Sequence, residues 1–475
     1  MLPLSVICGI GLWLRLHSLG ARSLWLDEGV SAMIARLSWT EFWKLVLWRE
    51  GNMTVYYLLL RGWAKLGFSE FHLRSLSVLA GVLTLLAIYL LGKELYGRTA
   101  GLLAALLLAL HSFHIRYSQE TRSYALLALT LVFAAYFLVR ALRTASDRDW
   151  TAFVLLSALS VYVHFFAILV VLAFLCSVLF VPARPAGARR WIRILGPLGL
   201  LVAPAIRYLL SHRNIGLIDW IPPPSWPLLA RCAAALLGTG GVLGLIYAMT
   251  CLGPFLAGGM RFTKSGHEGN SNRVVLPVLW TVLPGLVLLV ASFDRPVLID
   301  RYLLMSVPGF VLLASYGVTR LQERWRVSVA AILVLISAVS VQRSYQIYST
   351  ENQDWRGAVQ YAVRNSEPGD VVVLDNGIVR PVFEYYRQQS NASAPRAYSF
   401  VPRGDELIYR DFAGITAARV LDRVAQVHKR VWIFEWGAGN ALIPEMERRF
   451  RRARAQEFPH LKVRLYVGDP VSAPE

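Results

Sequence analysis

Repeated apolar stretches of about 20 residues constrain this chain more than any other feature of its sequence. A helix of that length rises about 30 Å and crosses the hydrocarbon core of a bilayer. Hydrophobic residues make up 56% of the chain and charged residues only 17%, below the share typical of soluble domains. The sequence therefore predicts a polytopic α-helical membrane protein with about eleven spans. They cover roughly residues 3–20, 73–92, 99–114, 121–140, 150–164, 165–182, 192–210, 232–257, 274–292, 303–319 and 327–343.

Basic residues in the short loops indicate the orientation of these spans. Loops of one side carry clusters such as Arg140, Arg143 and Arg148, whereas the short loops of the other side carry few. The positive-inside rule makes the first side cytoplasmic, so loop 20–72 and everything after about residue 344 lie outside. The same distribution argues against nucleic-acid binding despite the net charge of +19, because nucleic-acid binders gather basic residues on one soluble face.

The first outer loop contains two short aromatic segments, 37–48 and 54–67, that are too short to span a membrane. Their amphipathic pattern predicts helices lying in the interface, with Trp and Tyr at headgroup depth. Loop 211–226 is a second substantial outer loop with cationic and aromatic groups.

The four cysteines, Cys8, Cys176, Cys232 and Cys251, all lie in apolar stretches, so we expect no disulfide. Residues 1–14 lack the basic start of a cleavable signal peptide, so we expect the first span to remain.

Composition shifts after residue 344, which divides the chain into a membrane domain, 1–344, and an extracytoplasmic domain, 345–475. Short apolar strands alternate there with amphipathic helices, a pattern that predicts a small α/β domain. We expect helices at about 352–366, 379–387, 415–428 and 441–454, and strands at 371–374, 430–434 and 463–467.

Acidic and basic side chains gather where separate spans meet the predicted outer face. Asp27 and Glu28 follow the first span as an adjacent carboxylate pair, which is costly beside hydrocarbon unless solvated, paired or used. Carboxylates there could deprotonate an acceptor hydroxyl or hold a metal, and arginines could grip a phosphate bidentately. The combination favours group transfer from a lipid-linked phosphate. The other candidates are Glu50, Arg116, Gln119, Glu120, Arg122, Tyr124, His164, Asp300, Arg301 and Tyr302.

Each candidate also has a structural interpretation. The Asp27-Glu28 pair could cap a helix, and Glu120 could form a local ion pair with Arg122. Arg301 could extend its charged head from a helix end towards the interface, and His164 could be a satisfied core histidine. The Asp354-Trp355-Arg356 run is most simply a helix cap followed by a packing contact.

Several blocks resemble the bacterial family 39-type glycosyltransferases of the GT-C superfamily, which contains protein O-mannosyltransferases and the lipid A aminoarabinose transferase. These blocks appear in the family's order and cover most of the membrane part. They are Leu24-Trp25-Leu26-Asp27-Glu28, Tyr56-Tyr57-Leu58-Leu59-Leu60, residues 69–77, residues 116–124, Arg301-Tyr302-Leu303-Leu304 and residues 354–358.

The resemblance implies a GT-C fold and an inverting transferase that uses a polyprenyl-phosphate sugar, with its active site outside a bacterial inner membrane. Asp27 would be the general base and Glu28 and Glu120 its catalytic neighbours. Arg301 would lie near the lipid phosphate. The remaining substrate-binding candidates come from the resemblance or, for His164, from its place at the predicted outer face alone. They are Glu50, Tyr57, Arg116, Gln119, Arg122, Tyr124, His164 and Tyr302.

One departure from the family bears on metal binding. Many relatives have His-Pro-Pro before the Tyr-Tyr block, where this chain has Asn52-Met53-Thr54-Val55. No metal ligand is therefore assigned, and a requirement for a divalent metal stays open.

The expected partners are the bilayer, a polyprenyl-phosphate-linked sugar and a lipid, glycan or protein acceptor. A transporter or lipid flippase is the main alternative, although it should show internal repeats of its spans, which this sequence lacks. A non-catalytic scaffold that binds partners through its C-terminal domain is a second alternative.

Overall fold

The structure, a computed structural model, shows two compact units that each combine distant parts of the chain. The first unit contains residues 1–17, 49–56 and 74–345. The second contains residues 18–48, 57–73 and 346–475, so most of the first loop folds with the C-terminal region. The structure describes residues 2–180, 188–211, 220–257, 271–350, 353–390, 395–399, 421–422, 424, 427–437 and 442–468.

Each predicted apolar stretch coincides with a helix or a pair of helices. Among the described residues, six helices are long and apolar enough to cross a membrane, or up to eight if each of two bent pairs counts as one span. The chain is thus a multi-pass membrane protein. The six segments are Glu70–Tyr96 (α5), Tyr124–Thr144 (α8), 191–211 in α11 (Ala188–Ser211), 274–291 in α14 (Ser271–Ala291), 300–320 and 323–347 in α16 (Glu323–Thr350).

The remaining predicted spans correspond to shorter or bent helices. Those at residues 3–20, 150–164 and 165–182 are α1 (Leu2–Leu16), α9 (Asp147–Val163) and α10 (Ala167–Val178). The break that separates α9 from α10 falls at His164, as predicted. The bent pairs are α6 (Arg98–Ala109) with α7 (Ser112–Ser118), and α12 (Trp226–Leu237) with α13 (Gly241–Ala257).

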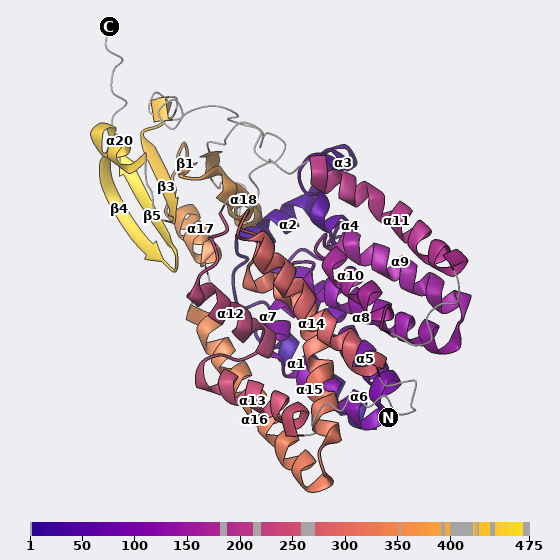
Figure 1. Ribbon diagram of the computed structural model, residues 1–475. Helices are drawn as coiled ribbons and strands as arrows, with labels where there is room; N and C mark the ends of the chain where they lie inside the picture. Colours follow the sequence, from indigo (N-terminus) through magenta and orange to yellow (C-terminus); the bar gives the residue numbers. More distant parts are fainter. Residues whose placement is uncertain are drawn as a thin grey trace. The chain divides into compact units, whose positions relative to one another are not determined.

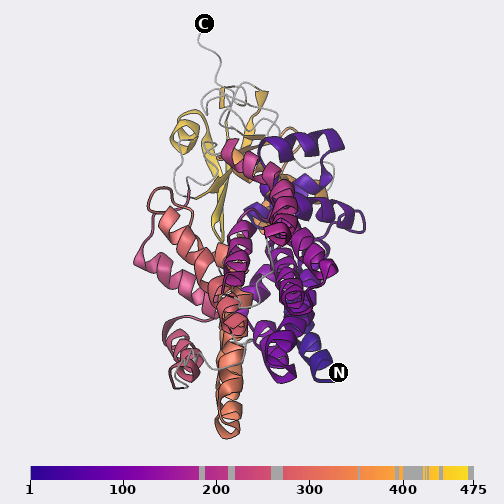
Figure 2. The same cartoon turned by 45° about the vertical axis from the view of Figure 1, so that its right-hand side comes forward.

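The helices of the first unit run side by side around one hydrophobic core (Figure 1, Figure 2). Helix α8 packs along α9, and α14 packs between α10 and α15 (Val307–Arg320), which follows the short 3-10 helix η2 (Asp300–Ser306). The buried indole of Trp280 in α14 donates a 2.7 Å hydrogen bond to the Met305 carbonyl, which satisfies its only polar group.

The second unit contains a five-stranded mixed sheet in the order β2-β1-β3-β5-β4 (Figure 1). Strand β1 is parallel to β2 and β3, whereas β5 is antiparallel to β3 and β4. The strands are β1 (Val371–Leu374), β2 (Arg396–Ser399), β3 (Arg430–Trp436), β4 (Arg451–Phe458) and β5 (Leu461–Val467).

Side chains of β3 alternate between two buried faces. Val431 and Ile433 join the cluster that includes Met446 of α20 (Leu442–Arg449), whereas Phe434 stacks on Trp355 of α17 (Trp355–Arg364). Helices therefore cover both faces of the sheet, as expected for strands that are buried on both sides.

Two details of the predicted α/β domain need correction or completion. Residues 451–454 were expected to end a helix, but they begin strand β4 at the edge of the sheet. The run Arg-Arg-Ala-Arg lacks the apolar alternation by which a strand is predicted. Its charged residues are nevertheless typical of protected edge strands. The helix expected at 415–428 falls largely outside the described residues.

The expected interfacial segments are helical. Residues 37–48 contain α3 (Trp39–Trp48), and residues 54–67 contain α4 (Thr54–Trp63). Another helix, α2 (Leu26–Arg36), precedes them and was not predicted. It packs against α18 (Arg380–Gln389) of the same unit.

Candidate functional site

The predicted carboxylate pair lies in the first turn of α2. The backbone N–H groups of a helix start are free and carry a partial positive charge, which favours acidic residues there. Glu28 is fully buried, and its Oε2 accepts a 3.4 Å hydrogen bond from the Trp25 N–H at the helix start. Asp27 is only half-buried. The two carboxylates thus occupy different environments, and Asp27 is the more accessible of them.

A sharp bend delivers a second group of candidates. Helices α6 and α7 meet at 64°, and α7 carries Arg116 shortly before Glu120. Arg116 Nε lies 3.3 Å from Glu120 Oε1, while the Glu120 side chain is only 9% exposed. The predicted neighbour Arg122 is half-buried, and its carbonyl accepts a hydrogen bond from Ser77 Oγ at 3.2 Å.

Arg15, which is not among the predicted site residues, holds this bend. Its guanidinium is completely buried and donates to the carbonyls of Ala109 and Leu108, at 3.2 and 3.3 Å. The last carbonyls of a helix lack helical donors; here the Leu108 carbonyl also accepts from the His111 N–H at 3.3 Å. The Arg15 guanidinium also lies 2.8 Å from His114 Nδ1 and 3.3 Å from Ser118 Oγ in α7. An arginine inside the first apolar span was the signal that could have identified it.

Gln119 makes the reciprocal contact. Its Nε2 donates to the carbonyls of Arg15 and His17, at 3.0 and 2.8 Å, and to that of Leu14 at 3.3 Å. Leu14 and Arg15 lie in the last turn of α1 and His17 follows the helix, so the Gln119 amide caps α1 while Arg15 caps α6. Gln119, predicted to bind substrate, has its amide nitrogen directed to the protein backbone.

An aromatic cluster surrounds His164 at the break between α9 and α10. The imidazole lies 5.7 Å from the ring of Tyr124 and 5.6 Å from that of Tyr302, measured between centroids. Asn52 Nδ2 is 3.4 Å from His164 Nε2, and Asn52 Oδ1 accepts a 2.9 Å bond from the Phe165 N–H. Asn52 thus lies against the histidine at the break between α9 and α10.

Two arginines contribute positive charge to this cluster. Both Arg122 and Arg301 act electrostatically on His164. The Arg301 guanidinium carbon lies 5.0 Å from the ring centroid of Trp220 and 5.9 Å from that of Tyr302. Guanidinium groups stack on aromatic rings through their faces and bind anions bidentately through their edges.

The structure therefore brings together five predicted residues of the first unit: Arg122, Tyr124, His164, Arg301 and Tyr302. Arg116, Gln119 and Glu120 follow on α7 or directly after it, and Glu50 precedes the 3-10 helix η1 (Gly51–Met53). Asp27, Glu28 and the buried Tyr57 belong to the second unit. Within the described part of the chain, no group of three or more His, Cys, Asp or Glu side chains is arranged to hold a metal ion.

Comparison with known proteins decides the fold. Residues 54–208 match the family model described as dolichyl-phosphate-mannose-protein mannosyltransferase. The chain superposes on the crystal structure of ArnT from Cupriavidus metallidurans in the apo state with a TM-score of 0.67, over 97% of each chain and at 11% identity. The chain has the GT-C fold.

Other GT-C structures agree with this assignment. ArnT from the same organism bound to undecaprenyl phosphate matches with a TM-score of 0.65, 12% identity and 99% coverage of each chain. The oligosaccharyltransferase of Archaeoglobus fulgidus in its apo form matches with a TM-score of 0.54 and 11% identity, over 91% of this chain and 69% of that one. No curated protein matches the sequence. The resemblance to family 39-type GT-C proteins is confirmed by these matches.

Proposed function

We propose that this GT-C protein transfers a sugar from a polyprenyl phosphate to an acceptor hydroxyl at the extracytoplasmic face of a bacterial inner membrane. The observation that carries the proposal is the full-length fold match to ArnT bound to undecaprenyl phosphate. The mannosyltransferase family match over residues 54–208 supports the same reaction class. The acceptor is a lipid, a glycan or a protein of the cell envelope.

The proposed step is a single displacement with inversion at the anomeric carbon. The acceptor oxygen forms a bond to that carbon while its proton passes to the Asp27 carboxylate. The bond between the anomeric carbon and the phosphate oxygen breaks, and its electron pair leaves with polyprenyl phosphate. A half-buried carboxylate at a helix start suits the role of base, because an acceptor hydroxyl can reach it.

Arginines take the place of a general acid in this scheme. The leaving phosphate needs its charge held rather than a proton, and guanidinium groups do this bidentately. Arg301, stacked on Trp220 and Tyr302, is assigned to the phosphate, and Arg122 and Arg116 are assigned supporting roles. The aromatic surfaces of Tyr124 and Tyr302 beside His164 are assigned to the sugar or the first isoprene units.

Transfer assays with Asp27→Asn test the proposal. Purified protein is incubated with a panel of radiolabelled polyprenyl-phosphate sugars and envelope acceptors, and product formation is followed. We expect a loss of at least about 100-fold in turnover, within the range of a positioned general base. Glu41→Gln is the matched control, because Glu41 also lies in the first turn of a helix of the second unit, where it accepts from Ser38. Equal turnover by Asp27→Asn and the control would rule out Asp27 as the base.

The proposed orientation has its own test. Lys462 lies on β5 with its side chain 52% exposed, so Lys462→Cys places a reachable thiol in the α/β domain. In intact cells, a membrane-impermeant maleimide should label this variant from outside. Labelling only after the inner membrane is broken would place the domain in the cytoplasm.

A further inference from the structure

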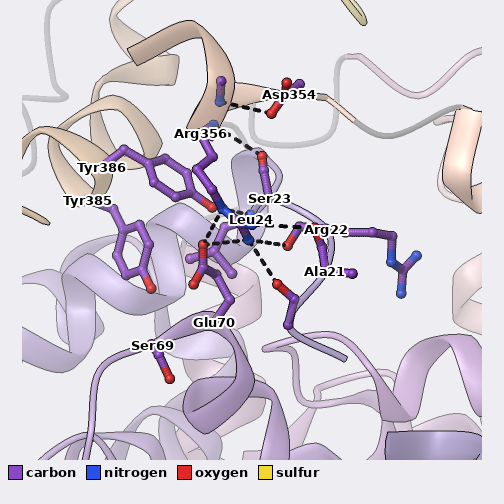
Figure 3. Close-up of polar contacts among 12 residues, drawn as sticks. Ala21, Arg22, Ser23, Leu24, Ser69, Glu70, Asp354, Arg356, Tyr385 and Tyr386 are labelled. Atoms are coloured by element: carbon purple, nitrogen blue, oxygen red, sulfur yellow. Dashed lines mark hydrogen bonds and ion pairs between the residues drawn. The ribbon is translucent and has the colours of Figure 1, made fainter. Parts of the chain in front are cut away.

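One arginine makes several of the contacts between the C-terminal domain and the first loop. Arg356 lies in the first turn of α17, and its side chain extends to the irregular segment 20–24 that precedes α2 (Figure 3). All of these residues belong to the second compact unit. The Asp354-Trp355-Arg356 motif, which the proposed chemistry does not use, therefore attaches the domain to the start of the loop that carries Asp27.

The guanidinium of Arg356 makes contacts with both ends of the first loop. Its Nε and Nη2 lie 2.9 and 2.8 Å from Glu70 Oε1. Nη2 also donates to the carbonyls of Gly20 and Arg22, at 3.0 and 3.1 Å, and Nη1 donates to that of Ala21 at 3.4 Å. The planar fork of arginine holds five donors in a fixed geometry that suits several acceptors, whereas lysine has a compact ammonium group with three rotatable donors.

Neighbouring groups complete the attachment. The backbone N–H of Arg356 donates to Ser23 Oγ at 3.2 Å, and Ser23 Oγ donates to the Gln353 carbonyl at 3.0 Å. The Leu24 N–H donates to the Tyr386 hydroxyl at 2.6 Å. Burial raises the pKa of Tyr386 well above its ordinary value, so its hydroxyl stays neutral. Every residue from 20 to 24 therefore has a hydrogen bond to Gln353, Arg356 or Tyr386 of the C-terminal domain.

The motif also fixes Arg356 itself. Asp354 Oδ1 accepts from the Gly357 N–H at 2.9 Å and caps α17, while the completely buried Trp355 stacks on Phe434 with an interplanar angle of 4°. The cap and the indole tie the first turn of α17 to the sheet. Arg356, which follows Trp355 in this turn, thus extends from backbone that both contacts hold in place.

We propose that Arg356 is a positioning residue that fixes segment 20–24, and through it the start of α2, so that the Asp27 carboxylate keeps one orientation. The segment has no regular structure of its own, so its carbonyls need external donors to adopt a single conformation. This role rests on the proposed function in one respect, the assignment of Asp27 as the base. The attachment itself is independent of any activity.

Hydrogen–deuterium exchange of the full-length protein in detergent tests the attachment. Arg356→Ala should speed exchange of the amides of residues 20–26, with Leu24 foremost, by at least about tenfold. Arg430→Ala is the matched control. Arg430 also pairs with a carboxylate, Asp370 at 2.9 Å, and a carbonyl, that of Asn365 at 3.3 Å, but does not contact the loop. Wild-type exchange of segment 20–26 in Arg356→Ala would overturn the proposal. Should that variant fail to fold, Arg356→Lys takes its place, with a smaller increase expected.

Kinetics test the consequence for catalysis. Arg356→Lys should lower kcat by about 10-fold or more while KM for the lipid donor stays within about twofold. In the Asp27→Asn background, the same change should cause no further loss, because a residue that acts through Asp27 has nothing left to position. An equal loss in both backgrounds would overturn the positioning role. If the wild-type protein transfers no sugar, the proposed function fails, whereas the exchange experiment still decides whether Arg356 holds the loop.

Discussion

Gly29 is the position where the structure makes the sharpest prediction. It lies in α2, two residues after Asp27, and packs directly against the first turn of α18. A Cβ atom at Gly29 would lie 2.5 Å from Val382 Cβ, 2.6 Å from its Cα and 2.8 Å from its backbone nitrogen. Two of these three atoms are backbone, so a rotamer change cannot relieve the clash.

The size of the effect follows from these distances. Non-bonded carbon atoms prefer about 3.5 to 4.0 Å, so Gly29→Ala must move α2 away from α18 by roughly 1 Å. Overpacking of this kind costs about 1–3 kcal/mol, and the better helix propensity of alanine returns about 1 kcal/mol. The loss of stability should therefore be modest, about 0–2 kcal/mol. A displacement of about 1 Å at a catalytic group can cost about 100-fold in rate, so turnover should fall about 10- to 100-fold.

The assay compares Gly29→Ala with Gly62→Ala. Gly62 is also a helical glycine of the second unit, but a Cβ there would meet no atom within 4 Å. Both variants are measured for thermal unfolding in detergent and for transfer from the polyprenyl-phosphate donor. We expect Gly62→Ala to behave like the wild type and Gly29→Ala to lose turnover while remaining folded. Equal turnover in the two variants would show that the contact between α2 and α18 does not position Asp27.

Three further predictions concern other parts of the chain. Arg15→Met removes the buried guanidinium that donates to the Ala109 and Leu108 carbonyls, so stability should fall by about 1–3 kcal/mol. Thermal unfolding measures the change, and unchanged stability would contradict the capping role. Burial raises the pKa of Asp375 to about 6, above its value of 3.8 in an unfolded chain. The Asp375 carboxyl therefore stays protonated to a higher pH in the native state than in the unfolded state. Stability should therefore fall as pH rises from about 4 to 6, and Asp375→Asn should weaken that fall in melting curves taken across the range. The exposed indoles of Trp39, Trp43 and Trp48 in α3 should be quenched by lipids brominated near the headgroup, and Trp43→Ser should reduce the quenching.

Local patterns in the sequence predicted most of the elements correctly. Apolar runs identified the membrane helices, since hydrocarbon requires long apolar segments wherever they lie in the fold. The run Val371–Leu374 identified a buried strand, because a short apolar run rich in β-branched residues and preceded by turn residues is typical of strands. The edge strand β4 was missed, since its charged sequence forms a strand only when β5 supplies a partner.

The candidate site was predictable only in its residue types. Sequence order showed that Tyr124, His164 and Tyr302 belong to ends of separate helices, but only folding brought their rings within 6 Å. Similarly, no local signal indicated that the Gln119 amide would cap α1 or that Glu28 would be buried. Caps that join distant segments depend on where other helices end, which the local sequence does not specify.

The sequence by itself determined that this chain enters a membrane through many helices, carries acids and arginines at their ends and ends in a small α/β domain. These properties depend on the hydrophobicity and periodicity of short stretches. Only the tertiary structure decided that residues 18–48 and 57–73 fold with the C-terminal domain, because contacts such as Arg356 with Glu70 join groups 286 residues apart. Such contacts depend on how the whole intervening chain folds, and no local sequence pattern predicts them.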